Sequence, residues 1–175
     1  IAHAWLDRAP LIALTDQYPG PVYETGLRQV IDHRQIFAPI TKWSTTLHAK
    51  SARVQIRKAL RIARQSAPGP VHIDVISSET TSDAGDAKYI HPVLPDRLIP
   101  EPSKSSLSEP IAMIKKAKKP IVLVGLGVLW DEAASELVGF IEHLDAPVLT
   151  TSKVKGAIPE DHDLRAGCII GGLIE

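Results

Sequence analysis

Two glycines and a group of hydroxyl and amine side chains stand where α/β proteins place their ligand-binding loops. Gly125 and Gly127 follow residues 121–124, a short apolar run rich in β-branched residues that predicts a strand buried on both faces. Residues 147–149 predict a second strand, with small and polar residues behind it. Because ligands of open α/β sheets bind at the carboxyl ends of the strands, this edge is a candidate nucleotide site. The candidate binding residues are Gly125, Gly127, Thr151, Ser152 and Lys153.

The details of this edge argue against a nicotinamide dinucleotide. The dinucleotide fingerprint requires a third glycine where Trp130 stands, and an acidic residue at the end of the next strand, where the chain has threonines. A GxxxxGK[ST] loop is also absent from the sequence, which excludes a P-loop kinase or ATPase. Two alternatives stay open: a tight turn without a ligand, and a site for a flavin or an adenosine phosphate.

The other residues that could do chemistry do not form a recognisable pattern. The seven histidines show neither HxxxH nor HExxH spacing, so the sequence predicts no metal site. His162 lies between Asp161 and Asp163, but adjacent side chains usually point apart, and turn formation explains such a cluster better than acid–base catalysis. The sequence has no GxSxG elbow, and its single cysteine, Cys168, is expected to be a buried structural thiol.

Helical and strand patterns alternate along the chain. Strands are predicted at 11–14 and 71–76, and a helix at 51–66 with apolar residues at spacings of three and four. Another helix is predicted after Asp131, taken as its N-cap. Residues 77–106 are rich first in Ser, Thr, Asp and Gly and then in Pro, as in an extended linker. The expected fold is α/β, with two partial or small parallel-sheet (Rossmann-like) units joined by this long Pro-rich linker.

Composition excludes several classes of partner. The formal net charge is zero, so the basic face of the 51–66 helix is expected to be solvated, with no nucleic acid bound. No apolar run approaches the roughly 20 residues of a membrane span, so no membrane partner is expected. One cysteine suits a reducing interior, and a cytoplasmic location is expected. The chain begins without methionine and in apparent helix, which suggests a fragment.

Several stretches, in order, resemble thiamine diphosphate-dependent enzymes of the acetolactate synthase and 2-oxo-acid decarboxylase group. The stretches are AWLDRAPLIALTDQYP, RQVIDHRQIFAPITKWS, APGPVHIDV, KKAKKPIVLVGLGV and APVLTTSKVKGAIPEDHDLRAG. The resemblance implies that residues 1–80 are the closing part of the pyrimidine-binding domain. Residues 81–106 would then be the linker, and residues 107–175 the first part of the central domain.

The resemblance also implies cofactors and chemistry. The parent enzyme would use thiamine diphosphate and Mg²⁺ to form or cleave a bond beside the carbonyl of a 2-oxo acid, as a homodimer or homotetramer. Gln29 would line the substrate side of the cofactor, and the edge at Gly125, Gly127, Thr151, Ser152 and Lys153 would hold FAD or ADP in some members. The family's activating glutamate and GDG…N motif are not in this sequence, so the chain alone is expected to be inactive. A stand-alone nucleotide-binding or regulatory module and a purely structural dimerisation piece are the alternatives.

Overall fold

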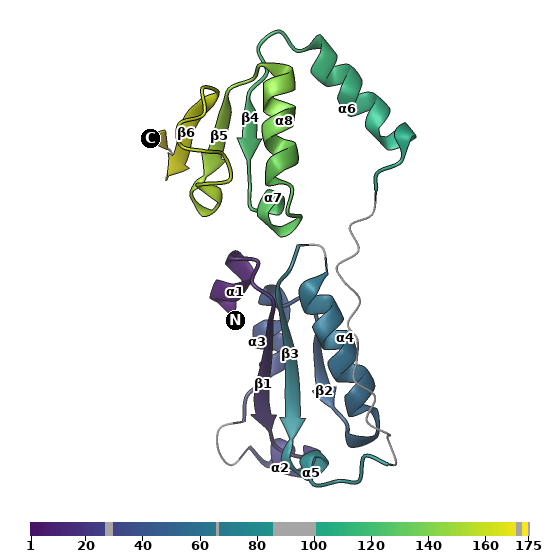
Figure 1. Ribbon diagram of the computed structural model, residues 1–175. Coiled ribbons are helices and arrows are strands. Elements are labelled where there is room, and N and C mark those ends of the chain that lie inside the picture. The colour runs from purple at the N-terminus through teal and green to yellow at the C-terminus, as the bar shows by residue number, and fades with distance from the viewer. Residues whose placement is uncertain (27–29, 66, 86–100, 171–172, 175) are drawn as a thin grey trace. The chain divides into compact units, whose positions relative to one another are not determined.

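The computed structural model describes residues 1–26, 30–65, 67–85, 101–170 and 173–174. The chain divides into two compact units, Ile1–Leu98 and Ile99–Glu175. Each unit is built on its own sheet, in agreement with the predicted α/β class and the two small parallel-sheet units (Figure 1). The proline-rich segment expected between them falls mainly within 86–100, outside the described residues.

The first unit contains three parallel strands in the order β1-β3-β2. In chain order its elements are α1 (Ala2–Leu6), β1 (Leu11–Gln17), α2 (Gly20–Thr25), α3 (His33–Phe37), the 3₁₀ turn η1 (Ala38–Ile40), β2 (Ser44–Leu47), η2 (Ala49–Ser51), α4 (Ala52–Arg64), β3 (Pro70–Ile76) and α5 (Ser77–Thr80). The central strand β3 carries Val71 and Ile73 on one face and His72 and Asp74 on the other, because side chains alternate along a strand.

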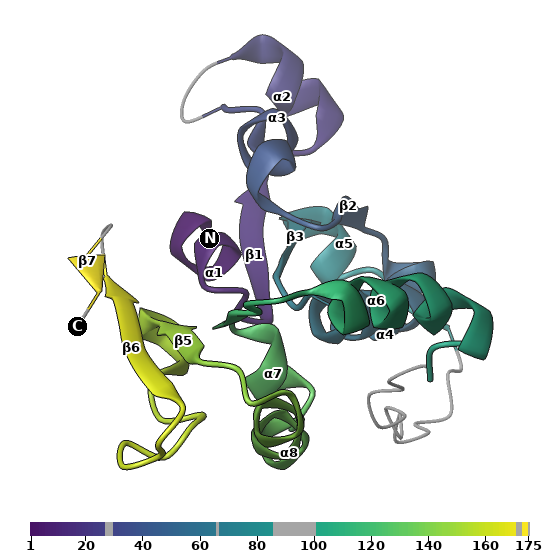
Figure 2. The same cartoon turned by 90° about the horizontal axis from the view of Figure 1, so that it is seen from above.

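The two faces of this sheet differ in chemistry. Helix α4 packs Ala59 and Ala63 against the buried Val71 and Ile73, and this forms the core of the unit. Helix α3 contacts the opposite, polar face, where the Phe37 ring lies 4.7 Å from the ring of His72. Helices α3 and α4 thus lie against opposite faces of the sheet, as Figure 2 shows.

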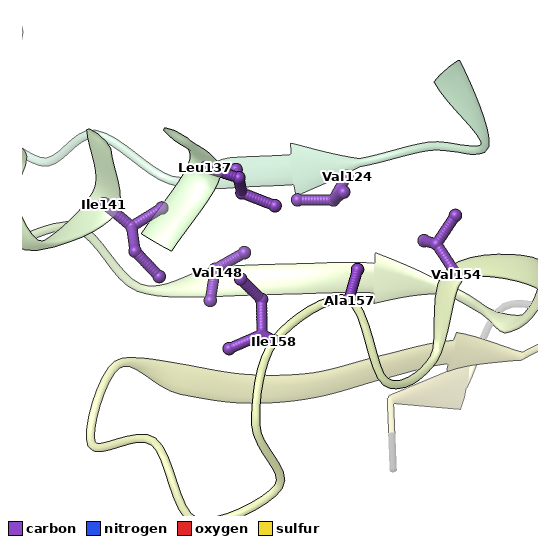
Figure 3. Close-up of a cluster of buried hydrophobic side chains, with 7 residues drawn as sticks. All are labelled: Val124, Leu137, Ile141, Val148, Val154, Ala157 and Ile158. Atoms are coloured by element: carbon purple, nitrogen blue, oxygen red, sulfur yellow. The ribbon is translucent and has the colours of Figure 1, made fainter. Parts of the chain in front are cut away.

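The second unit has a sheet in the order β4-β5-β6-β7, of which the first three strands are parallel and β7 is antiparallel. Its elements are α6 (Lys104–Lys116), β4 (Val122–Val124), α7 (Gly127–Trp130), α8 (Ala134–Leu144), β5 (Val148–Thr151), η3 (Ser152–Val154), β6 (Arg165–Ile170) and β7 (Leu173–Ile174). Helix α8 and the strands share one buried cluster, drawn in Figure 3: Val124, Leu137, Ile141, Val148, Val154, Ala157 and Ile158.

Three expected boundaries in the second unit are wrong. Asp131 does not cap the long helix: the turn α7 forms first, the Asp131 N–H donates to the carbonyl of Gly127 at 3.0 Å, and α8 starts at Ala134. Strand β5 continues to Thr151 because it pairs with β4 on one side and β6 on the other. The linker expected to extend to residue 106 ends earlier: helix α6 starts at Lys104, capped by Ser103, whose hydroxyl accepts from the Ser106 N–H.

The first unit also departs from expectation at one strand. Strand β1 was expected to end at Leu14, but it pairs with β3 as far as Gln17, so Thr15 and Asp16 lie within the ladder.

Among the helices of the described segments, none combines the length and apolar character needed to cross a bilayer.

Candidate functional site

The predicted edge of the second unit is assembled by two neighbouring parallel strands. Val124 pairs with Thr150, so Gly125, which follows β4, and Thr151, the last residue of β5, lie side by side at the carboxyl edge. Gly127 opens α7 two residues beyond Gly125, and Ser152 and Lys153 form η3 directly after Thr151. The structure therefore brings the five predicted binding residues to one edge of one sheet.

The glycine backbone at this edge is open to approach. A Cβ placed on Gly125 or Gly127 would have no neighbouring heavy atom within 4 Å. Neither glycine has the left-handed backbone conformation that would require glycine. A turn alone therefore does not explain these two glycines, and the space beside them is compatible with a ligand lying against the main chain.

Two other predicted candidates have different outcomes. Gln29 lies outside the described residues. His162 contacts neither neighbouring aspartate: its Nδ1 accepts from the Leu164 N–H at 3.2 Å, and its Nε2 lies 3.4 Å from Glu142 Oε1. These contacts fix a turn against α8, as the sequence favoured, and do not form an acid–base pair with Asp161 or Asp163.

A polar cluster in the first unit is absent from the sequence-based list of candidates. It lies on the α3 face of the sheet. The Thr15 hydroxyl donates to Asp74 Oδ1 at 2.8 Å and lies 2.7 Å from His72 Nε2. His33 Nδ1 lies 2.9 Å from the same Asp74 oxygen, and Ser44 Oγ lies 2.8 Å from His72 Nδ1. Sequence spacing cannot find this group, because 39 to 41 residues separate His33 from the other two and only the strand and helix positions bring them together.

The protonation of His72 follows from these contacts. Because the Thr15 hydroxyl gives its proton to Asp74, it accepts from His72 Nε2–H, and His72 Nδ1 then accepts from Ser44. Burial lowers the pKa of His72, against the opposing effect of the Asp74 carboxylate. His72 is therefore neutral at pH 7. The sequence does hold one signal for part of this cluster. His72 and Asp74 are two residues apart in a predicted strand, and this spacing places both side chains on the same face of the sheet.

The fold defined by these two units is that of α/β proteins built from parallel sheets with helices against their faces. Residues 107–173 match the family described as thiamine pyrophosphate enzyme, central domain. The chain is 34% identical over 176 residues to a probable acetolactate synthase large subunit of Methanocaldococcus jannaschii, covering 97% of this chain and 29% of that protein. It is 31% identical over 172 residues to the acetolactate synthase large subunit of Corynebacterium glutamicum, covering 95% of this chain and 27% of that protein.

The similarity extends to a second activity and to a solved structure. Identity to a glyoxylate carboligase of Escherichia coli O157:H7 is 27% over 164 residues, covering 93% of this chain and 28% of that protein. A thiamine diphosphate-dependent 4-hydroxybenzoylformate decarboxylase of Rhodococcus jostii RHA1 shares the fold, with a TM-score of 0.69 and 22% identity, covering 86% of this chain and 29% of that one.

These matches identify the chain as a relative of the thiamine diphosphate-dependent enzymes, and the resemblance predicted from the sequence is confirmed. The chain spans about three tenths of the length of these relatives.

Proposed function

We propose that this chain is the part of a thiamine diphosphate-dependent, acetolactate synthase-like enzyme that joins the pyrimidine-binding domain to the central domain. The observation that carries the proposal is the alignment of nearly the whole chain with acetolactate synthase large subunits. Residues 1–80 would form the last part of the pyrimidine-binding domain, residues 81–106 would form the linker, and residues 107–175 would form the first part of the central domain. The family match over residues 107–173 supports the last assignment. The relatives are enzymes, so nothing favours a stand-alone regulatory module or a structural piece.

The complete enzyme would form or cleave a carbon–carbon bond beside the carbonyl of a 2-oxo acid. Thiamine diphosphate, held with Mg²⁺, supplies the electron sink for this chemistry when it is bound. We propose that this chain's own residues have a supporting role, with Gln29 on the substrate side of the cofactor. We propose a cytoplasmic homodimer or homotetramer, as the family resemblance implies.

The printed chain lacks the family's activating glutamate segment and its GDG…N motif, so we expect it to be inactive alone. With thiamine diphosphate, Mg²⁺ and pyruvate, the 175-residue polypeptide should show no turnover. The full-length protein that contains this segment should consume pyruvate only when thiamine diphosphate is present. Turnover by the 175-residue chain, or cofactor-independent turnover by the full-length protein, would contradict the proposal.

For the edge of the second unit, we propose FAD or ADP as the ligand. Gly125, Gly127 and Thr151 would lie against it, with Ser152 and Lys153 offering a hydroxyl and an amine from η3. The open space beside Gly125 supports this proposal and also provides its test. A Cβ at Gly125 meets no heavy atom within 4 Å in the ligand-free chain, and Gly125→Val places two methyl groups where the ligand would approach.

Calorimetric titration with FAD and with ADP is expected to show saturable binding that weakens at least about tenfold in Gly125→Val. Gly139→Ala is the matched control, because Gly139 lies on the exposed side of α8 and also has open space around it. Equal affinity in the Gly125→Val and Gly139→Ala chains, or no binding by the folded unsubstituted chain, would refute the nucleotide proposal for this edge.

A further inference from the structure

The polar cluster of the first unit has the composition and placement of a metal site. His72 and Asp74 point from the same face of β3, the central strand, and are completely buried. His33 is the first residue of α3, which covers that face. Two elements far apart in the sequence thus bring two imidazoles and a carboxylate together.

The distances between possible ligand atoms are short enough for one ion. One such atom from each of His33, His72 and Asp74 lies within 4.8 Å of the others. His33 Nδ1 is 2.9 Å, and His72 Nε2 is 3.6 Å, from Asp74 Oδ1. Ligands bound to a tetrahedral zinc ion at about 2.0–2.1 Å lie roughly 3.3 Å apart, so only small side-chain movements are needed.

An unsatisfied atom provides the second, independent observation. Asp74 Oδ2 is buried and has no hydrogen-bond partner among the described residues, while the side chain as a whole is 1% exposed. A buried carboxylate oxygen without a partner is costly, because its lost hydration is not replaced. The hydrogen bonds to Thr15 and His33 both go to Oδ1, so the network that exists without a metal leaves this oxygen unexplained.

The surroundings of His72 also suit a metal ligand. Histidines that bind metals commonly donate their second ring N–H to a neighbouring oxygen, which fixes the ring and its tautomer. Ser44 Oγ lies 2.8 Å from His72 Nδ1 and can accept that N–H once Nε2 binds the ion. Thr15 Oγ1 lies 2.7 Å from His72 Nε2 and offers a further hydroxyl beside these ligand atoms.

We propose that His33 Nδ1, His72 Nε2 and the Asp74 carboxylate bind one divalent first-row transition-metal ion, of which Zn²⁺ is the probe. Two imidazole nitrogens favour such an ion over Mg²⁺ and Ca²⁺, which prefer oxygen ligands. The ion ties α3 to the central strand of the sheet. Its role is structural, and it is distinct from the Mg²⁺ of the proposed parent enzyme.

The test uses the metal-stripped 175-residue chain, titrated with Zn²⁺ in competition with a chromophoric chelator and, separately, with Co²⁺ under visible absorption. We expect one tightly bound equivalent of Zn²⁺ and an intense Co²⁺ band typical of four-coordination. Millimolar Mg²⁺ should not compete. His33→Gln should weaken Zn²⁺ binding at least about tenfold, the usual effect of disturbing a metal site.

The matched control is His48→Gln. His48 also lies in the first unit beside a carboxylate, 3.9 Å from Glu79, but is 60% exposed. Its substitution should leave Zn²⁺ binding unchanged. His33 is 19% exposed, so His33→Gln removes a ligand without opening a buried cavity, and circular dichroism checks that it folds. Asp74→Asn is the second variant and should weaken binding in the same way.

Three results would overturn the proposal. The first is a folded chain that binds no Zn²⁺ at micromolar concentration. The second is undiminished binding by folded His33→Gln, which would place the ion on other histidines. The third is a weak, six-coordinate Co²⁺ spectrum, which would indicate loosely held surface ions.

Discussion

At the scale of single residues, His72 shows how the fold sets protonation. The imidazole is enclosed in the sheet, with Ser44 on one nitrogen and Thr15 on the other, and burial lowers its pKa. The unfolded chain exposes the same ring to water, where the ordinary pKa of about 6.5 applies. Folding therefore favours the neutral ring, and the free energy of unfolding depends on pH.

The sign of this dependence follows from proton counting. Between pH 7 and pH 5 the unfolded state binds the His72 proton more readily than the folded state, so stability decreases as the pH falls through about 6.5. One such group contributes a slope of at most about 1.4 kcal/mol per pH unit. Urea titrations of the chelator-treated chain at several pH values measure this slope of the free energy of unfolding against pH.

His72→Gln should lower stability at pH 7 and flatten this slope, because its buried amide does not titrate. His48→Gln, at an exposed histidine, is the control for the loss of an imidazole elsewhere in the unit. A His72→Gln chain with the same pH dependence as the parent would show that His72 is not the responsible group.

Residue-level prediction from the sequence placed the candidate residues of the second unit at one edge, and it missed the polar cluster of the first unit. Gly125 and Thr151 could be placed at this edge because Gly125 directly follows β4 and Thr151 is the last residue of β5. His33, His72 and Asp74 were missed as a group because β3 pairs between β1 and β2, and only this pairing places His72 and Asp74 under α3. Contacts that depend on the order of the strands in a sheet are not marked by any characteristic spacing of residues along the sequence.

At the scale of elements, tertiary pairing decided the boundaries that local pattern missed. The apolar stripe of α8 was predicted, and its Leu137 and Ile141 are buried against β4 and β5. The end of β5 was not predicted: Thr150 and Thr151, whose β-branched side chains suit a strand, extend β5 by pairing with Cys168 and Ile169 of β6. The turn α7 displaced the predicted N-cap at Asp131 because Gly125, Leu126 and Gly127 carbonyls accept bonds from the next turn.

Two glycines of the second unit should respond in opposite ways to alanine. Gly139 lies inside α8, with helical backbone and open space around a Cβ, so Gly139→Ala should stabilise the helix by about 0.5–1 kcal/mol. Gly156 has equal space but a φ of +95°, which L residues rarely adopt. Gly156→Ala should therefore destabilise the loop that follows η3.

Amide hydrogen exchange measures both effects locally. Protection of α8 amides should rise about two- to fivefold in Gly139→Ala, the factor that corresponds to 0.5–1 kcal/mol. Protection around Gly156→Ala should fall. A fall in α8 protection after Gly139→Ala would mean that the exposed face of α8 is covered in solution.

At the scale of the whole molecule, the α/β class and the family could be predicted from the sequence because both depend on the order of segments along the chain. Successive strand and helix patterns indicated two parallel-sheet units, and the structure contains them. The ends of the long connection were not predicted in detail, since α5 and the early start of α6 occupy part of the expected linker.

If the proposed function is correct, this chain corresponds to a working segment of an acetolactate synthase. A segment exchange tests this claim directly. In the C. glutamicum large subunit, the 172-residue match would be replaced by the aligned residues of this chain, and acetolactate formation from pyruvate measured with and without thiamine diphosphate. A hybrid carrying Ile73→Asp, which places a charge in the core under α4, is the inactive control.

We predict thiamine diphosphate-dependent acetolactate formation by the hybrid and none by the Ile73→Asp control. A hybrid that folds and assembles like the C. glutamicum subunit, yet forms no acetolactate, would contradict the account.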